Sequence, residues 1–196
     1  MIIKLVRHGR SMGNEDPSTY ITTPDHAIEL TEEGKQQARD LATNPDMFKK
    51  EYLNGQIEYT MVYCSPFTRA IQTMNLFFEA LGMGTHRSSR YLSIDHRIRE
   101  QSWGKPRSVE EHDDLVAHHM NNRYYGKTAV SESGEMMIDR VHSFIDRIET
   151  RNKDCLIFTH GATINAFKAI LKGYTIEQFE NLGFVRNCSI TTIKIN

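Results

Sequence analysis

Three short apolar runs in the sequence are each followed by residues whose side chains could bind and transfer phosphate. The segments after the runs are, in order, Arg7-His8-Gly9, Ser65-Pro66-Phe67-Thr68-Arg69 and Thr159-His160-Gly161. In open parallel sheets the ligand binds outside the carboxyl ends of the strands, so these segments are expected at one crevice. Cationic side chains gathered there repel one another unless an anion compensates them. Because a guanidinium fork matches phosphate oxygens and an imidazole can act as a nucleophile, the pattern predicts a phosphate site.

The elements that would position these segments follow from the apolar patterning. The runs Ile2 to Val6, Tyr59 to Cys64 and Cys155 to Phe158 are short and bounded by polar residues, as buried parallel strands are. Helices are predicted from Thr31 to about Asn44, from Ser65-Pro66 to about Leu81, from Glu132 to Thr150 and from Gly161 to Leu171, and a last strand from Ser189 to Ile195.

This alternation of strands and helices predicts the fold class. We expect an α/β three-layer sandwich in which helices cover both faces of a mostly parallel central sheet. Residues 1–196 would form a single domain, since this length suits one hydrophobic core. Residues from about 83 to 130 fit the alternation less well. We expect them to form a small cap-like insertion of loops and short helices over the sheet edge.

Composition and charge exclude several classes of partner. With 24 Lys and Arg against 25 Asp and Glu, the formal net charge is -1, so no global charge draws the chain to nucleic acid or an acidic membrane. No apolar stretch approaches the roughly 20 residues of a membrane helix, and the N-terminal run is too short for a signal peptide. The cysteines are odd in number and are expected to be reduced core thiols: Cys64, Cys155 and Cys188. We therefore expect a cytoplasmic protein, either monomer or homodimer.

The segment LVRHGRSMGN resembles the signature of the histidine phosphatase superfamily, which includes the cofactor-dependent phosphoglycerate mutases. Further blocks that match in order are TPDHAIELTEEGKQQA, SPFTRAIQT, RIREQSWG, the pair Glu132-Ser133 before DRV, and FTHGATI. The resemblance covers nearly the whole chain, and these ordered blocks are far more specific than one Arg-His-Gly triplet. The resemblance implies a phosphoglycerate mutase-like fold.

The resemblance also implies roles for individual residues. His8 would be phosphorylated during turnover, while Arg7, Arg69 and His160 would hold the transferred phosphoryl group, with His160 cationic. Glu100 would be the proton donor, which requires a pKa raised by burial or by nearby phosphate. For attack, the reacting nitrogen of His8 must be unprotonated, and a backbone hydrogen bond at its other nitrogen could fix that tautomer. Without the resemblance, Glu100 would be interpreted as a surface carboxylate paired with Arg97 or Arg99.

Four further residues are predicted to contact the substrate or line the pocket. Asn14 and Ser11 lie in the loop after the Arg-His-Gly triplet and could hydrogen-bond to phosphate. Trp103 could wall the pocket, or it could only anchor its loop. Gly161 would let the helix after His160 begin close to phosphate.

Two departures from the family pattern leave roles open. Ser131 stands where glycine is usual and Met136 where an acidic residue is common, so Glu132-Ser133 could simply cap the following helix. Arg10 replaces an acidic or amide residue and could favour more highly charged substrates. The region from 83 to 130 is locally basic, which either attracts an anion or is balanced by its own acidic residues.

Other phosphate chemistries are less consistent with the sequence. Cys64 and Arg69 are separated by four residues, whereas a cysteine phosphatase loop needs five. His112-Asp113, His118 and His119 could hint at a metal-dependent hydrolase, but exposed helix residues explain them better. No HExxH spacing, paired CxxC or glycine-rich nucleotide loop occurs, so neither a metal nor a cofactor is expected.

The sequence therefore predicts a metal-independent phosphatase that hydrolyses phosphomonoesters through a phosphohistidine intermediate on His8. Its substrate would be a small phosphorylated molecule or a phosphoprotein. A cofactor-dependent phosphoglycerate mutase is the first alternative, although the family's mutases usually have longer chains. A non-catalytic binder of phosphorylated ligands, acting in signalling, is the second.

Overall fold

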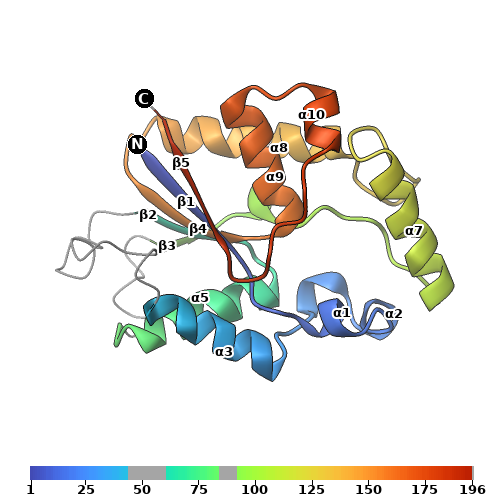
Figure 1. The fold of residues 1–196 in the computed structure, drawn as a ribbon, viewed down its shortest axis with the longest axis horizontal. Helices are drawn as coiled ribbons and strands as arrows, with labels where there is room; N and C mark the ends of the chain where they lie inside the picture. Colours follow the sequence, from blue (N-terminus) through green and yellow to red (C-terminus); the bar gives the residue numbers. More distant parts are fainter. Residues whose placement is uncertain (44–60, 84–91, 196) are drawn as a thin grey trace.

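The computed structural model describes residues 1–43, 61–83 and 92–195, and a five-stranded sheet forms the centre of this part of the chain (Figure 1). The strands are β1 (Ile2–Arg7), β2 (Met61–Cys64), β3 (Leu92–Ile94), β4 (Cys155–Thr159) and β5 (Ile190–Lys194). Their order is β3-β2-β4-β1-β5, and only β5 runs antiparallel to its neighbour. The predicted mostly parallel sheet is thus confirmed. The first two residues of the predicted second strand, 59 and 60, lie outside the described residues.

Helices occupy both faces of this sheet. The described helices are α1 (Met12–Glu15), α2 (Thr19–Thr22), α3 (Glu32–Asp40), α5 (Thr68–Ala80), α7 (Val109–Asn121), α8 (Gly134–Glu149), α9 (Gly161–Lys172) and α10 (Ile176–Glu180), with the 3₁₀ turns η1 (Asp25–Ala27), η2 (Leu41–Thr43) and η4 (His96–Ile98). Figure 1 shows α8 and α9 on one side of the sheet and α3 and α5 on the other.

Each side of the sheet has its own buried apolar cluster. On the side of α8 and α9, Phe144 and Phe167 pack against each other and against Ile157 of β4. On the side of α5, Phe77 and Phe78 pack against Phe158 of the same strand. Successive side chains of β4 therefore contribute to opposite cores, as expected for a strand covered on both faces. The three-layer sandwich is confirmed.

Two predicted helix starts need correction. The prediction placed Pro66 in the first turn of a helix, but α5 begins only at Thr68 because Phe67 is still extended, with φ -73° and ψ 136°. The Ser65 hydroxyl accepts a hydrogen bond from the Phe67 N–H at 3.3 Å, which stabilises the turn between β2 and α5. Helix α8 begins at Gly134 rather than Glu132, and Ser133 caps it by accepting from the Met136 N–H at 3.1 Å.

The remaining predicted elements agree with the structure. Thr31 caps α3 by accepting from the Gly34 N–H at 3.0 Å, and the helix continues as a 3₁₀ turn to Thr43. Residue 44, the predicted end of this helix, lies outside the described residues. Helix α9 and strand β5 match their predicted positions to within one residue at each end.

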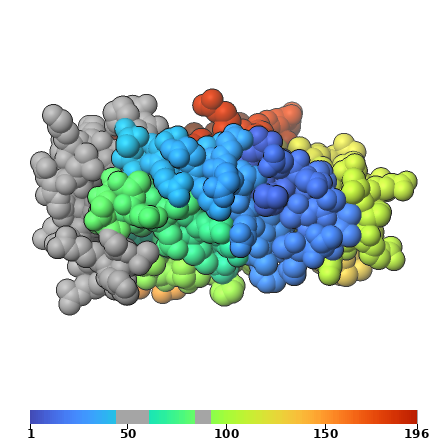
Figure 2. Space-filling view, turned by 90° about the horizontal axis from the view of Figure 1, so that it is seen from below, coloured from blue at the N-terminus to red at the C-terminus, as the bar shows by residue number. Residues whose placement is uncertain are grey.

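The stretch from about 83 to 130, predicted to form loops and short helices, contains the 13-residue helix α7, and its residues 84–91 lie outside the described residues. Helix α7 runs beside the segment of α1 and α2, which Figure 2 shows as blue next to yellow-green. Tyr20 of α2 stacks on His112 of α7 with ring centroids 5.1 Å apart. Only His119 is buried among the residues of α7, so no apolar stripe marks the helix in the sequence. His119 itself corrects the expectation that the histidines of this region are exposed.

The three cysteines are free, as predicted. Cys64 and Cys155 are buried and Cys188 is half-buried. Burial raises the pKa of the Cys155 and Cys188 thiols to about 12, so both are protonated at neutral pH. In the described part of the chain, no helix combines the length and the apolar character that crossing a membrane requires.

Gly34 tests how tightly the loop after β1 is packed. A Cβ atom at Gly34 would overlap the backbone carbonyl of Arg10, which follows the Arg-His-Gly triplet. We expect Gly34→Ala to lower the free energy of unfolding by about 1–3 kcal/mol, because backbone must move to make room. Urea unfolding followed by circular dichroism measures this loss. The matched control is Gly183→Ala, where a Cβ would meet no heavy atom within 4 Å; an equal loss in both variants would contradict the prediction.

Candidate active site

The carboxyl ends of three adjacent strands bring the predicted site residues together. Arg7 is the last residue of β1, and the N–H of His8 donates to the carbonyl of Thr159 at the end of β4, 3.0 Å away. The N–H of Ser65 donates to the carbonyl of Phe158 at 2.9 Å. The backbone ladder therefore continues beyond the strands and fixes the three segments side by side.

His8 is held in one tautomer. Its side chain is buried, and Nδ1 lies 2.7 Å from the carbonyl oxygen of Gly9. Because a carbonyl oxygen can only accept, Nδ1 must carry the proton and Nε2 must be the unprotonated nitrogen of the neutral ring. Burial, and then the charges of Arg69 and Arg7, lower the pKa of His8 well below its ordinary value. The ring is thus neutral, and Nε2 has a free lone pair.

His160 lies next to His8, and its ring is neutral in the structure without a bound anion. The two ring centroids are 5.2 Å apart in an edge-to-face arrangement. His160 Nε2 is 2.7 Å from the hydroxyl oxygen of Ser65, and its buried Nδ1 has no hydrogen-bond partner among the described residues. Burial and the positive charge of Arg69 lower the pKa of His160 well below its ordinary value. Burial and nearby positive charge both disfavour the cationic form of the ring.

Arg7 has a buried donor atom without a hydrogen-bond partner among the described residues. Its side chain is buried, one terminal nitrogen donates to the carbonyl of Val185, and the ring of Phe184 covers the guanidinium at 4.3 Å. Its Nε has no hydrogen-bond partner in the described part of the chain. A Cβ on Gly161 would lie 3.4 Å from this Nε, so the glycine leaves space around the donor at the start of α9.

Arg69 is aligned by a carboxylate that the sequence analysis did not identify. Arg69 lies in the first turn of α5, its side chain is 3% exposed, and its Nη1 forms an ion pair with Asp25 Oδ1 at 2.8 Å. The same nitrogen donates to the carbonyl of Asp25 at 2.6 Å, and the ring of Phe67 lies 5.0 Å from the guanidinium carbon. Asp25 falls inside the TPDH block, so the family resemblance was the available signal.

Glu100 occupies a half-buried position whose electrostatics suit an acid. Burial raises the pKa of its carboxyl, and the positive charges of Arg69 and Arg7 oppose that rise. The alternative of a surface ion pair is excluded, because the nearby arginines are engaged elsewhere. Arg97 pairs with Asp95 at 2.7 Å, and Arg99 pairs with Glu132 at 2.9 Å.

Asn14 and Ser11 support the loop that carries His8. Asn14 Oδ1 accepts from the Ser11 N–H at 3.2 Å and from the Asn187 side-chain amide at 3.1 Å. The same amide nitrogen of Asn187 donates to the carbonyl of His8 at 3.0 Å. Asn14 is exposed, while Ser11 is fully buried. Asn187 was not predicted because it lies 179 residues from His8 in the sequence.

Trp103 and Arg10 make contacts away from His8 and His160. Trp103 stacks on His119 of α7 with ring centroids 5.6 Å apart, which anchors its loop to that helix. Arg10 pairs with Glu33 of α3 at 2.7 Å, so its charge already has a partner. This ion pair weakens the argument that Arg10 attracts highly charged substrates.

Two further site residues could not have been found from the sequence. Thr73 accepts from the Gly9 N–H at 3.0 Å and donates to the carbonyl of Arg69 at 2.7 Å, so it joins the loop of His8 to α5. Burial raises the pKa of the Tyr20 phenol, and the positive charge of Arg69 opposes that rise. Thr73 ends the SPFTRAIQT block, but nothing in that block indicates a contact with Gly9, and Tyr20 lies outside the quoted blocks.

The donors around this pocket suit an anion better than a cation. Within residues 1–43, 61–83 and 92–195, no group of three or more His, Cys, Asp or Glu side chains is arranged to hold a metal ion. The pocket instead collects two guanidinium groups, two imidazoles and the N-terminus of α9, which His160 begins. Backbone N–H groups and the dipole at a helix N-terminus favour anions.

Comparisons with known proteins agree with this geometry. Residues 3–196 match the sequence profile of the histidine phosphatase superfamily, branch 1, and the chain belongs to this family. It is 30% identical to the phosphoglycerate mutase-like protein AT74H of Arabidopsis thaliana, over 98% of this chain and 73% of that protein. It is also 30% identical to a protein of Hydrogenobacter thermophilus that is named, provisionally, phosphoserine phosphatase 2, over 96% of this chain and 87% of that one. The crystal structure of the alpha-ribazole phosphatase from Shigella flexneri has the same fold, with a TM-score of 0.72, 24% identity, and coverage of 100% of this chain and 91% of that one.

The buried neutral histidines make stability depend on pH. Because the folded-state pKa of His160 is depressed, the unfolded chain binds a proton more readily at pH values below about 6.5, and the free energy of unfolding falls as the pH falls. This imidazole contributes up to about 1.4 kcal/mol per pH unit in that range. Between pH 7.5 and 5.5, the free energy of unfolding in urea should therefore fall less for His160→Asn than for the wild type. His142→Asn is the control, because that side chain is 60% exposed on α8; identical losses in all three proteins would contradict the assignment.

Proposed function

We propose that this protein is a phosphatase that hydrolyses phosphomonoesters without a metal, through a phosphohistidine intermediate on His8. The observation that carries the proposal is the tautomer of His8. Its Nδ1–H is held by the Gly9 carbonyl at 2.7 Å, which leaves Nε2 unprotonated beside Arg7 and Arg69. A nucleophile with a free lone pair and two adjacent cations meets the main requirements for accepting a phosphoryl group.

The first step forms the bond between Nε2 of His8 and phosphorus and breaks the bond between phosphorus and the ester oxygen. Glu100 gives its proton to that leaving oxygen, for which its raised pKa is suitable. In the second step the ionised Glu100 takes a proton from water, whose oxygen attacks the phosphorus of phospho-His8. The P–N bond breaks, inorganic phosphate leaves, and the histidine and the protonated Glu100 are restored.

Arg7, Arg69 and His160 would stabilise the charge on the equatorial phosphate oxygens. The Nε of Arg7 and the Nδ1 of His160 are both buried, and neither has a hydrogen-bond partner among the described residues. A phosphate dianion beside His160 would raise its pKa, so the ring would take up a proton on binding. The cationic His160 expected from the sequence thus belongs to the substrate complex in this proposal.

Support for a phosphatase rather than a mutase comes from the relatives. The Hydrogenobacter thermophilus protein provisionally named a phosphoserine phosphatase is aligned over most of both chains. The name of the Arabidopsis relative points to phosphoglycerate mutases by likeness alone. A small phosphorylated molecule is the proposed substrate, because the name of the Hydrogenobacter thermophilus relative points to phosphoserine.

The proposal predicts metal-free phosphate release that depends on His8. With chelator present, the wild type should release phosphate from p-nitrophenyl phosphate and from 3-phosphoglycerate, whereas His8→Ala should lose a factor on the order of 10⁴ or more. Rapid quenching in base should trap a phosphorylated wild-type chain, because phosphohistidine survives base and not acid. His142→Ala, on an exposed face of α8, should retain activity.

Other outcomes would identify a different function or contradict the role of His8. Conversion of 3-phosphoglycerate to 2-phosphoglycerate after priming with bisphosphoglycerate, without net phosphate release, would identify a mutase. Full activity of the His8→Ala variant would contradict the assignment of His8 as the nucleophile. Binding of phosphate with no turnover in any assay would identify a binding protein.

The acid role of Glu100 predicts a selective defect. Glu100→Gln cannot donate the proton, so kcat/KM for an alkyl phosphate should fall by about 10²–10⁴-fold. The loss should be much smaller for p-nitrophenyl phosphate, whose leaving group departs without protonation. Steady-state kinetics on both substrates provide the measurement, and an equal loss on both would contradict the acid role.

A further inference from the structure

The backbone that leads into Glu100 is bound by side chains from other elements. After η4 the chain from 99 to 108 contains neither helix nor strand, so its carbonyl groups need partners elsewhere. Thr159 Oγ1 donates to the carbonyl of Ile98 at 2.7 Å, and Thr163 Oγ1 donates to that of Arg99 at 2.7 Å. These bonds tie the segment to the end of β4 and the start of α9, where His160 lies.

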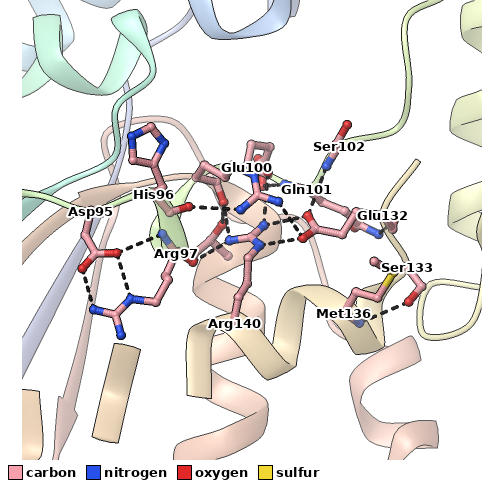
Figure 3. Close-up of polar contacts among 12 residues, drawn as sticks. Asp95, His96, Arg97, Glu100, Gln101, Ser102, Glu132, Ser133, Met136 and Arg140 are labelled. Carbon is pink, nitrogen blue, oxygen red and sulfur yellow. Dashed lines mark hydrogen bonds and ion pairs between the residues drawn. The ribbon is translucent and has the colours of Figure 1, made fainter. Parts of the chain in front are cut away.

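Arg140 of α8 binds the same segment from the other side (Figure 3). Its Nη1 donates to the carbonyls of Arg97 and Arg99, the latter at 3.0 Å, and its Nη2 donates to the carbonyl of Glu100 at 3.2 Å. Nε and Nη2 also donate to the two carboxylate oxygens of Glu132, at 2.7 and 2.8 Å. The guanidinium, 11% exposed, is thus held in a fixed plane.

Glu132 extends this contact past Glu100. Its N–H donates to the carbonyl of Ser102 at 2.6 Å, and its Oε2 accepts from the Ser102 N–H at 3.4 Å. Its carbonyl accepts from the side-chain amide of Gln101 at 3.0 Å. The pair formed by Glu132 and Arg140 therefore holds the backbone both before and after Glu100, as the dashed lines of Figure 3 show.

The carboxyl of Glu100 has little support of its own. Among the described residues, the hydrogen bond recorded for it comes from the following N–H, that of Gln101, at 3.1 Å. Its direction is consequently set by the backbone, and the backbone is set by Arg140 and the two threonines. A displacement of about 1 Å is enough to cost an acid much of its effect, since proton transfer needs hydrogen-bond distance to the leaving oxygen.

We propose that Arg140, fixed by Glu132, is a positioning residue that aims Glu100 at the leaving-group oxygen. The proposal rests on the proposed acid role of Glu100. It gives the Glu132-Ser133 motif two separate tasks. Ser133 caps α8, and Glu132 orients the guanidinium that holds the acid's backbone.

A purely structural role for the pair would give a different kinetic result. Loss of structural support lowers the activity toward every substrate by the same factor. Loss of the acid's position lowers the activity in proportion to how much the leaving group needs a proton. The slope of log kcat/KM against the pKa of the leaving group separates the two cases, because kcat/KM reports the steps up to the first phosphoryl transfer.

The test variant is the double substitution Glu132→Gln with Arg140→Met. It removes the donors to the three carbonyls without leaving an unpaired buried carboxylate, which would endanger the fold. We expect kcat/KM for an alkyl phosphate to fall at least about 10-fold more than for p-nitrophenyl phosphate, in the direction of Glu100→Gln. A series of substituted phenyl and alkyl phosphates measures the slope, and circular dichroism checks the fold of each variant.

Two control variants isolate the positioning effect. Arg97→Met removes the neighbouring ion pair with Asp95 at 2.7 Å, and the buried Asp95 carboxylate keeps Arg147 as a partner at 3.3 Å. The Arg97 guanidinium donates to Ser143 and not to the carbonyl of Glu100. The slope of this variant should equal that of the wild type. Glu132→Gln alone retains Arg140 and should change the slope less than the double substitution.

The outcomes distinguish this inference from the proposed function. A steep slope in both Glu100→Gln and the double variant supports the positioning role. A steep slope in Glu100→Gln with a wild-type slope in the double variant overturns the positioning role and leaves the acid role intact. A wild-type slope in Glu100→Gln overturns the acid role and the inference with it.

Discussion

The arrangement of the site depends on one electrostatic constraint, which is the burial of four basic groups at a single edge of the sheet. Each of these groups is at most 4% exposed: Arg7, Arg69, His8 and His160. Within the described residues, Arg69 has an ion-pair partner, which is Asp25. In the free protein the two imidazoles are neutral, so the arginines carry the positive charge of the four groups. An anion bound beside these groups would compensate this charge.

Such a site requires a rigid frame, because the basic groups would otherwise move apart. The frame consists largely of contacts to backbone. Gly9 approaches α3 so closely that a Cβ would overlap the carbonyl of Gly34, and its N–H is bound by Thr73. Arg140 holds three carbonyls around Glu100. Every reacting group therefore lies on, or is hydrogen-bonded to, an element of the sandwich rather than on a free loop.

How much of this could be predicted from the sequence depends on whether a feature is local. The strands β1, β2 and β4 could be predicted because buried parallel strands are continuous apolar runs, and α8 could be predicted from its apolar stripe. Helix α7 could not, because one buried residue, His119, leaves no stripe. His8, Arg69 and Glu100 were accessible through motif resemblance, whereas the partners that orient them come from distant positions.

The sequence does not show which group each of those distant partners orients. Arg140 lies 40 residues from Glu100, and Asp25 lies 44 from Arg69, so no spacing rule connects them. The Glu132-Ser133 motif was visible, but the sequence could only suggest a cap. Its second task depends on the topology of the fold, which brings α8 beside the segment after η4. Contacts of this kind are determined by tertiary packing and become predictable only with the fold in hand.

A single physical cause, burial, sets the two proton states that the proposed chemistry needs. Removal from water disfavours charge, so it lowers the pKa of His8 and raises that of Glu100. The positive charges of the arginines lower the pKa of His8 further, because they disfavour another cation. They also oppose the rise in the pKa of Glu100, because they stabilise a carboxylate. Phosphate in the pocket would neutralise the arginines and so remove their opposition to a protonated Glu100. The substrate's own charge would thereby favour the protonated acid at the moment when a proton is required.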